Sequence, residues 1–173
     1  MNKNNFLVFA VICLVTYIIR TIYEILKHKK ILVANKTTFV VMLINMVLLW
    51  MSWFSICADD IYRFRLVSPL NYLGLILFGL GLILFLTALF TIKALESYEG
   101  DLLTKGIYSI IRHPMYLGFI LWLVGLPIYY RALSASILAL FFIANVLFWR
   151  HLEEIELVER FPAYKDYRKK TIF

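Results

Sequence analysis

The sequence carries little charge for its length. Only 17% of its 173 residues are charged, whereas 62% are hydrophobic. A soluble domain of this length has more charge and far fewer uninterrupted apolar runs, so the composition excludes that class. The first residues lack the basic segment and the small-residue cleavage site of a secretory leader, and we expect the first apolar run to be retained. The chain is therefore predicted to be an all-α integral membrane protein that forms one compact bundle.

Cysteine is also scarce. The two cysteines, Cys13 and Cys57, both lie in apolar stretches. This excludes a disulfide framework and predicts two buried thiols, and no cysteine spacing typical of a metal site is present. His113, His151 and Glu154 could converge in the fold, but the spacing of His151 and Glu154 alone is poor evidence for a metal site. We therefore expect no metal.

Five apolar runs are candidates for membrane-spanning helices, because a helix needs about 20 residues to cross the hydrocarbon. They cover residues 6–26, 38–57, 70–94, 115–130 and 133–149. Only Arg131 and Ala132 separate the last two runs, which predicts a tight antiparallel hairpin. The third run contains Gly74, Gly79 and Gly81, small residues that favour close helix packing.

The net charge of +7 arises mainly from basic residues in the loops between apolar runs, so no nucleic-acid partner is expected. Lysine and arginine gather on the cytoplasmic side of membrane proteins. The more basic side contains Lys27, Lys29, Lys30, Lys36, Lys93, Lys105, Arg112, Arg150, Arg160, Lys165, Arg168, Lys169 and Lys170. The other side contains Lys3, Arg63, Arg65 and Arg131. The N-terminus is therefore predicted to lie outside and the C-terminal tail in the cytoplasm.

Two groups of charges in the first half of the chain have ordinary structural explanations. Arg20 and Glu24 are four residues apart near the end of the first run, which favours an ion pair directed at the lipid headgroups over a substrate contact. The loop of residues 59–65, with Asp60 and Arg63, is predicted to be solvated. Residues 96–101 are predicted to form a second polar loop.

Two polar clusters flank the last hairpin. The first is the stretch GIYSIIRHPMYLG, residues 106–118, in which Pro114 sets a helix start directly after Arg112 and His113. The second is RHLEE, residues 150–154, and the hairpin brings it back toward His113. The helix is expected to continue from residue 150 to 167 as an amphipathic segment that Pro162 breaks. Charges held beside so much hydrocarbon indicate a functional site.

These two clusters, followed by FPAYKDY at residues 161–167, resemble the isoprenylcysteine carboxyl methyltransferase family, which is related to the phospholipid N-methyltransferases. The resemblance covers roughly residues 100–170. It implies S-adenosylmethionine as the methyl donor and a cytoplasmic pocket between the last two spans and the tail. It also divides the single membrane domain, residues 1–173, into two N-terminal spans (1–68) and a methyltransferase core (69–173).

The resemblance implies a residue set for the pocket. The donor is expected to contact Tyr108, Arg112, His113, Pro114, Tyr116, Leu117, Gly118, Glu153 and Glu154. Gly118 would allow close backbone approach, and the tyrosines would offer rings and hydroxyls to adenine or ribose. Arg150 and Glu154 match the family's pair near the acceptor and are predicted to be catalytic. An arginine would hold an acceptor carboxylate, whereas an amine acceptor would need a base such as Glu154.

Several functions remain open at this point. The leading one is methylation of a lipophilic acceptor, a small molecule or lipidated chain like isoprenylcysteine, which enters sideways from the membrane lipids. Methylation of a phospholipid amine or a small thiol is the second. A non-enzymatic lipid-binding protein is the third, and donor binding would distinguish it. A reductase is disfavoured because the chain lacks the additional spans that membrane sterol reductases use.

Overall fold

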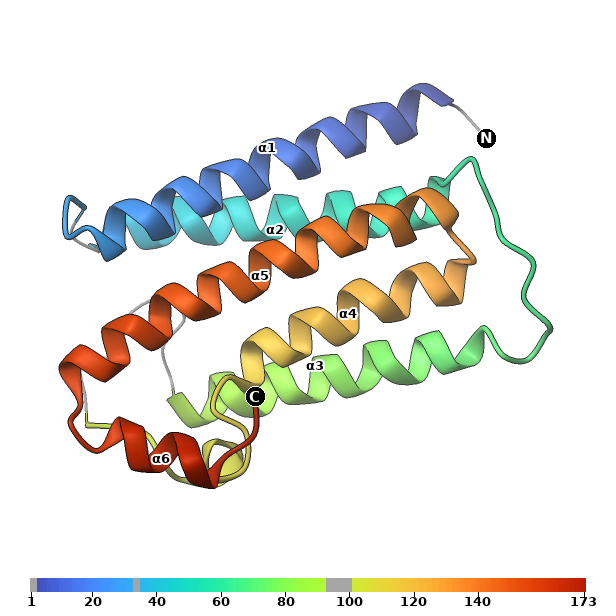
Figure 1. Cartoon of the computed structure of the whole chain (residues 1–173). Helices are drawn as coiled ribbons and strands as arrows, with labels where there is room; N and C mark the ends of the chain where they lie inside the picture. Colours follow the sequence, from blue (N-terminus) through green and yellow to red (C-terminus); the bar gives the residue numbers. More distant parts are fainter. Residues whose placement is uncertain (1–2, 33–34, 93–100) are drawn as a thin grey trace.

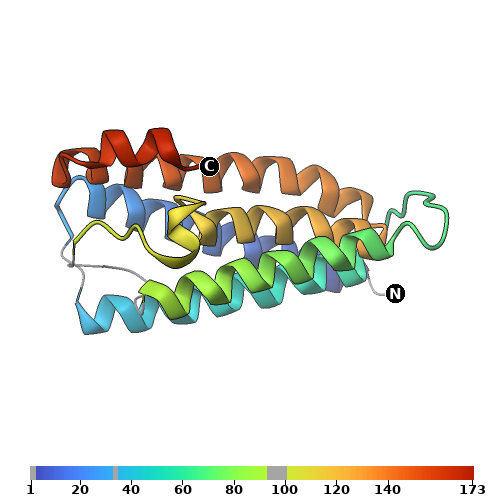
Figure 2. The same ribbon diagram turned by 90° about the horizontal axis from the view of Figure 1, so that it is seen from below.

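The computed structural model describes residues 3–32, 35–92 and 101–173, and every regular element within them is helical (Figure 1). The elements are α1 (Lys3–His28), α2 (Lys36–Asp59), α3 (Tyr72–Ile92), the 3-10 helix η1 (Gly106–Ser109), α4 (Pro114–Tyr130), α5 (Leu133–Arg160) and α6 (Tyr164–Lys170). The five long helices lie side by side, and α6 lies at the end of the bundle where α1 ends (Figures 1 and 2). This arrangement gathers the polar segments at one end.

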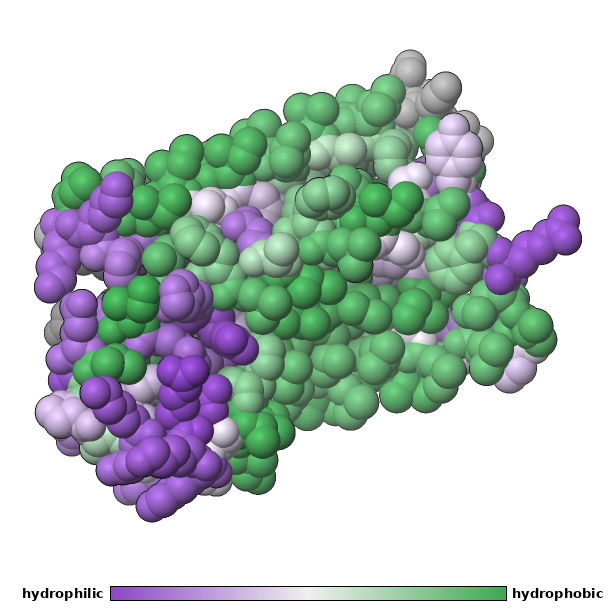
Figure 3. All heavy atoms as spheres, viewed as in Figure 1, coloured by the Kyte–Doolittle hydropathy of each residue, from purple (hydrophilic) through white to green (hydrophobic). Residues whose placement is uncertain are grey.

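The long helices have the dimensions and composition of membrane spans. Four of them, α1, α2, α3 and α5, are long and apolar enough to cross a bilayer, and α4 is a shorter apolar helix of 17 residues. Figure 3 shows apolar side chains along the length of the bundle and polar ones concentrated at the end that holds α6. The prediction of an all-helical integral membrane protein is confirmed. Each predicted span falls on one of these helices, although residues 93–94 lie outside the described residues.

Close packing of α3 on α4 depends on glycine pairs. A Cβ atom at Gly125 would lie 2.5 Å from the carbonyl oxygen of Gly74, and one at Gly118 would lie 2.7 Å from that of Gly81. The two backbones therefore approach as closely as small residues allow. The packing role is confirmed for Gly74 and Gly81 and is wrong for Gly79, where a Cβ atom would meet no atom within 4 Å. Gly79 is two residues from Gly81 and so lies on a different helix face.

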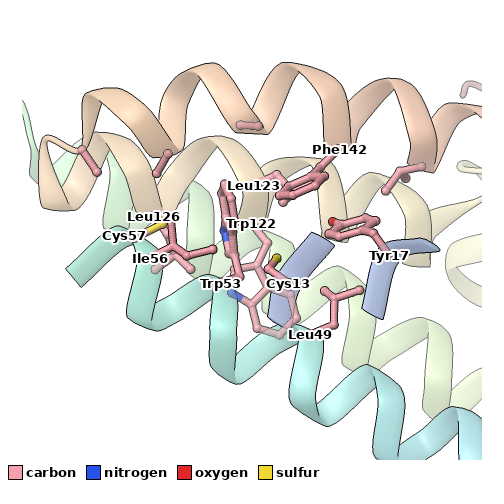
Figure 4. Packing of buried hydrophobic residues seen from close by; sticks show 14 of the residues in the cluster. Cys13, Tyr17, Leu49, Trp53, Ile56, Cys57, Trp122, Leu123, Leu126 and Phe142 are labelled. Atoms are coloured by element: carbon pink, nitrogen blue, oxygen red, sulfur yellow. The ribbon is translucent and has the colours of Figure 1, made fainter. Parts of the chain in front are cut away.

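Polar and aromatic contacts fasten α1 to the rest of the bundle. Thr21 Oγ1 accepts hydrogen bonds from Asn145 Nδ2 (2.9 Å) and Trp149 Nε1 (3.1 Å) of α5. The Tyr17 ring stacks on Phe142, with centroids 4.0 Å apart, in the aromatic core drawn in Figure 4. Cys13 and Cys57 lie buried in this core as free thiols, as predicted. The position of α1 is thereby fixed relative to α5.

The loop after α2 is exposed at Tyr62, Arg63 and Arg65, as predicted, but Asp60 departs from this prediction. The Asp60 side chain is fully buried, and its Oδ2 atom accepts a hydrogen bond from the backbone N–H of Ala135 at 2.8 Å. Arg63 donates to the carbonyl oxygens of Ala58, at 2.6 Å, and of Tyr130. Helix ends leave such N–H and C=O groups without partners inside the helix. Asp60 therefore caps the start of α5, and Arg63 caps the ends of α2 and α4.

The predicted amphipathic tail helix is interrupted. α5 runs without a break through residue 150 and ends at Arg160, two residues before Pro162. A separate short helix, α6, then begins at Tyr164. The break at Pro162 is confirmed, since proline cannot continue the hydrogen bonding of the preceding turn. The expectation of one helix through residue 167 is wrong, and the separate α6 folds back on the Arg-His-Pro segment.

The glycine pairs predict a stability difference between two alanine variants. Gly125→Ala should lower the free energy of unfolding by about 1–3 kcal/mol, because its Cβ atom meets backbone atoms of α3. Gly79→Ala is the matched control, and its greater helix propensity should leave stability unchanged or raise it by up to about 1 kcal/mol. Thermal unfolding of both variants in detergent measures the difference. Equal unfolding temperatures would contradict the packing account.

Candidate active site

Local backbone chemistry brings the Arg-His-Pro segment to the polar end of the bundle. Gly106 begins η1 with a φ of +60°, a left-handed conformation that suits glycine. His113 is the N-cap of α4, and Pro114 occupies its first turn, where no backbone N–H is needed. At the other end of α4, Arg131 adopts φ 56° and turns the chain into α5. The tight hairpin predicted from its two-residue link is confirmed.

The hairpin brings the two polar clusters together at His113. This side chain is buried, and its Nε2 atom lies 3.4 Å from Glu154 Oε1 and 3.3 Å from the Tyr164 hydroxyl. On the other side of the ring, Nδ1 lies 3.9 Å from Glu153 Oε2. Side chains from α5 and α6 therefore hold the imidazole from both sides. A histidine fixed in this way has a defined orientation.

Arg112 binds the C-terminal tail close to His113 and Glu154. Its Nη1 atom donates to the carbonyl oxygens of Thr171 (2.6 Å) and Arg168 (3.0 Å), and its Nε atom lies 3.4 Å from Glu154 Oε1. The backbone N–H of Arg112 also donates to the carbonyl oxygen of Ile172 at 3.1 Å. One arginine thus connects the segment before α4, the C-terminal turn of α6 and a carboxylate of α5.

Three tyrosines complete this region, and their hydroxyls remain protonated at neutral pH. Burial raises the pKa of Tyr108, and the nearby Glu153 charge adds to the effect. Burial also raises the pKa of Tyr164, which faces Glu154, and that of Tyr167 despite the opposing influence of Arg112. Tyr167 donates its hydroxyl proton to the carbonyl oxygen of Tyr108 at 2.6 Å. Each group can therefore serve as a hydrogen-bond donor.

A cavity of about 390 Å³ lies beside these residues, which is within the range of small-molecule sites. Its wall contains both polar and apolar side chains. The polar wall is formed by Arg20, Glu24, Lys27, His28, Asp101, Tyr108, Arg112, His113, Tyr116, Glu153, Glu156, Arg160, Tyr164 and Tyr167. The apolar wall is formed by Phe39, Met42, Leu43, Met46, Trp50, Phe85, Phe119 and other apolar side chains. The cavity suits a molecule, or two molecules, with one polar and one apolar end.

The cavity divides the predicted site residues into two groups. Those that line it are Tyr108, Arg112, His113, Pro114, Tyr116 and Glu153, whereas Leu117, Gly118, Arg150 and Glu154 lie outside its lining. Gly118 faces Gly81 of α3. Glu154 binds His113 from behind the cavity wall. The Arg150 guanidinium lies 4.7 Å from the centre of the Phe173 ring, so this side chain faces the tail.

Some residues at the cavity were not among the predicted site residues. Tyr164 and Tyr167 belong to the quoted FPAYKDY motif, and their three-residue spacing on a helix was the available signal. Arg20 and Glu24 were expected to face the headgroups, but both line the cavity. Of the predicted polar loop at 96–101, residues 96–100 lie outside the described residues, and Asp101 lines the cavity.

Comparisons with known proteins show which proteins the chain is similar to. A family model described as phospholipid methyltransferase matches residues 70–163. A protein-S-isoprenylcysteine O-methyltransferase B of Arabidopsis thaliana is 35% identical over 105 residues, which are 56% of this chain and 48% of the relative. The Mus musculus protein-S-isoprenylcysteine O-methyltransferase is 27% identical over 137 residues, 69% of this chain and 47% of the relative.

A third relative, a methanethiol S-methyltransferase of Pseudomonas deceptionensis, is 32% identical over 85 residues, 49% of this chain and 32% of the relative. The chain spans about half the length of the two isoprenylcysteine methyltransferases that it matches. No solved structure matches the chain significantly. The matched residues 70–163 contain α3, η1, α4 and α5, so they include one wall of the cavity, whereas α1 and α2 precede them.

The contacts of Arg112 predict the behaviour of the tail. Arg112→Gln should increase trypsin cleavage within α6 about tenfold, because the loss of charge-assisted hydrogen bonds to Arg168 and Thr171 frees this helix to open. Lys105→Gln removes an exposed cation of the same segment and is the matched control. Mass spectrometry of the fragments gives the cleavage rates. Identical rates in both variants would show that Arg112 does not hold the tail.

Proposed function

Because the chain belongs to the phospholipid methyltransferase family, we propose that it is an S-adenosylmethionine-dependent membrane methyltransferase with a lipophilic acceptor. The observation that carries the proposal is the continuous cavity, whose polar wall contains His113 and Glu153 and whose apolar wall contains Met46 and Trp50. A water-soluble donor fits the first wall, and a hydrocarbon tail fits the second. Both would then meet inside one site.

The polar wall has the donor and acceptor groups that S-adenosylmethionine requires. When bound, this donor supplies a methyl group on a sulfonium, which is electrophilic. Glu153 offers a carboxylate to its ammonium or ribose hydroxyls, and Tyr108 and Tyr164 offer rings and hydroxyls to the adenine. Arg112 and His113 would hold the polar end of the donor, and Pro114 and Tyr116 complete this wall. Leu117 and Gly118 would contribute by placing α4 against α3.

Arg150 and Glu154 act as positioning residues in this proposal rather than as groups that touch the reacting atoms. Glu154 Oε1 lies 3.4 Å from both His113 Nε2 and Arg112 Nε, so its charge would help to hold the two side chains that precede α4. Arg150 lies against Phe173 and supports the tail. Catalysis would then depend on placing the two reactants in line and excluding water, which is sufficient when the acceptor is already an anion.

The apolar wall favours an acceptor that enters from the bilayer. Leu43 lines the cavity and is also 39% exposed on the surface of the bundle, so the cavity approaches the lipid-facing side of α2. An isoprenylcysteine-like acceptor has the apolar tail that this path requires. A small thiol is a second candidate, because the chain is also similar to a methanethiol S-methyltransferase.

The orientation in the membrane follows from the distribution of basic residues. In this proposal all five long helices cross the bilayer, and α4, with 17 residues and a length of about 25 Å, spans most of the hydrocarbon. The N-terminus lies outside, and α6 and the donor site face the cytoplasm. Residues 1–68 contribute two spans, and residues 69–173 form the methyltransferase core.

Donor binding tests the proposed function. Calorimetric titration of S-adenosylmethionine, or of S-adenosylhomocysteine, into the protein in detergent should give saturable binding. His113→Ala should weaken this binding about tenfold or more, because the variant removes a buried polar side chain from the cavity wall. His151→Ala, which changes an exposed histidine of α5, is the matched control and should bind as the unaltered protein does.

Two results would contradict the proposal. The first is the absence of binding to protein whose helical content and thermal unfolding show that it is folded. That result would favour a lipid-binding protein without enzymatic activity. The second is unchanged affinity in His113→Ala, which would place the donor elsewhere.

A further inference from the structure

The cavity contains a charged pair that the matched family region does not supply. Arg20 and Glu24 belong to α1, which precedes the matched residues 70–163. The two side chains form an ion pair, and only 14% and 11% of their respective surfaces are exposed. Both line the cavity. A charged pair buried among membrane helices has a desolvation cost, so its presence at a cavity indicates a functional role.

The Arg20 guanidinium is held in place by its surroundings. Its central carbon lies 5.4 Å from the centre of the Tyr23 ring and 5.9 Å from that of Trp149, while Glu24 binds it through Nη2. Trp149 is itself fixed by its hydrogen bond to Thr21. Rings and a carboxylate therefore orient the planar group at the cavity wall before any ligand arrives.

This pair shares the cavity with residues of the proposed donor wall. Tyr116 of α4 and Glu153 of α5 line the same cavity as Arg20 and Glu24 of α1. The apolar side chains of α2, among them Met42 and Met46, line the same cavity. A ligand with its tail against α2 and its polar end toward Glu153 would bring that end to Arg20.

We propose that Arg20, oriented by Glu24, selects the acceptor by binding a carboxylate at the polar end of an apolar tail. This inference rests on the proposed methyltransferase function and names the acceptor class more narrowly. A guanidinium binds a carboxylate through two parallel hydrogen bonds, which an amine or a neutral thiol does not offer.

Methyl transfer to such an acceptor needs no general base. A carboxylate oxygen attacks the methyl carbon, the carbon–oxygen bond forms as the carbon–sulfur bond breaks, and sulfur keeps the electron pair. No proton is transferred, so the step does not require any of the carboxylates at the cavity to act as a base, and Glu24 can remain paired with Arg20. The negative charge of the acceptor and the positive charge of the donor disappear together, and this is favourable in a cavity with little water.

A pair of matched probes tests the inference. One is a prenyl thioether of about 15 carbons that ends in a carboxylate, and the other is its primary carboxamide. A chain of this length reaches through about half of the hydrocarbon of a bilayer. Binding of each is measured by calorimetry to protein saturated with S-adenosylhomocysteine. The unaltered protein should prefer the carboxylate about tenfold or more, and Arg20→Gln should remove this preference. Arg20→Lys, which keeps the charge without the planar fork, should retain only part of it.

The controls separate this inference from the proposed function. Arg65→Gln, an exposed arginine between α2 and α3, should keep the full preference, and each variant must still bind S-adenosylhomocysteine. If the folded, unaltered protein does not bind S-adenosylhomocysteine, the proposed function fails. If it does bind, the inference is overturned by equal affinity for the two probes, or by a carboxylate preference that survives in Arg20→Gln.

Discussion

The α4–α5 hairpin is the constraint on which the site depends. Its two-residue link forces the start of α4 and the C-terminal part of α5 to the same end of the bundle. His113 then meets Glu154 at 3.4 Å, and Arg112 meets the same carboxylate. Glycine pairs pack α4 closely against α3 and so fix the position of the hairpin in the bundle. Charged groups that would each be costly alone in hydrocarbon lie within ion-pair distance of one another at this end.

The cavity is lined by two parts of the chain. One part of its lining comes from the family region, with His113 and Glu153, and another comes from α1 and α2, with Arg20 and Met46. In our proposal the family residues hold the methyl donor. Arg20 and the apolar side chains of α2 bind the acceptor.

The sequence predicted the spans, the hairpin and the helix start at Pro114, because each depends on local features: run length, link length and the missing N–H of proline. It did not predict the roles of Asp60 and Arg63, since their partners are helix ends distant in the chain. The sequence also predicted that Arg20 faces the lipid headgroups, whereas this residue lines the cavity. The polar residues Thr16, Arg20 and Glu24 recur on one face of α1 and mark its inward side, but the sequence does not show that a cavity lies there.

The central claim is that the Arg-His-Pro segment and the end of α5 form one donor site. Hydrogen–deuterium exchange with and without S-adenosylhomocysteine tests it most directly. The account predicts that the ligand slows exchange together in residues 105–118 and 150–167, and leaves residues 60–71, at the opposite end of the bundle (Figure 1), unchanged. Protection of only one of the two segments, or of residues 60–71 instead, would contradict it.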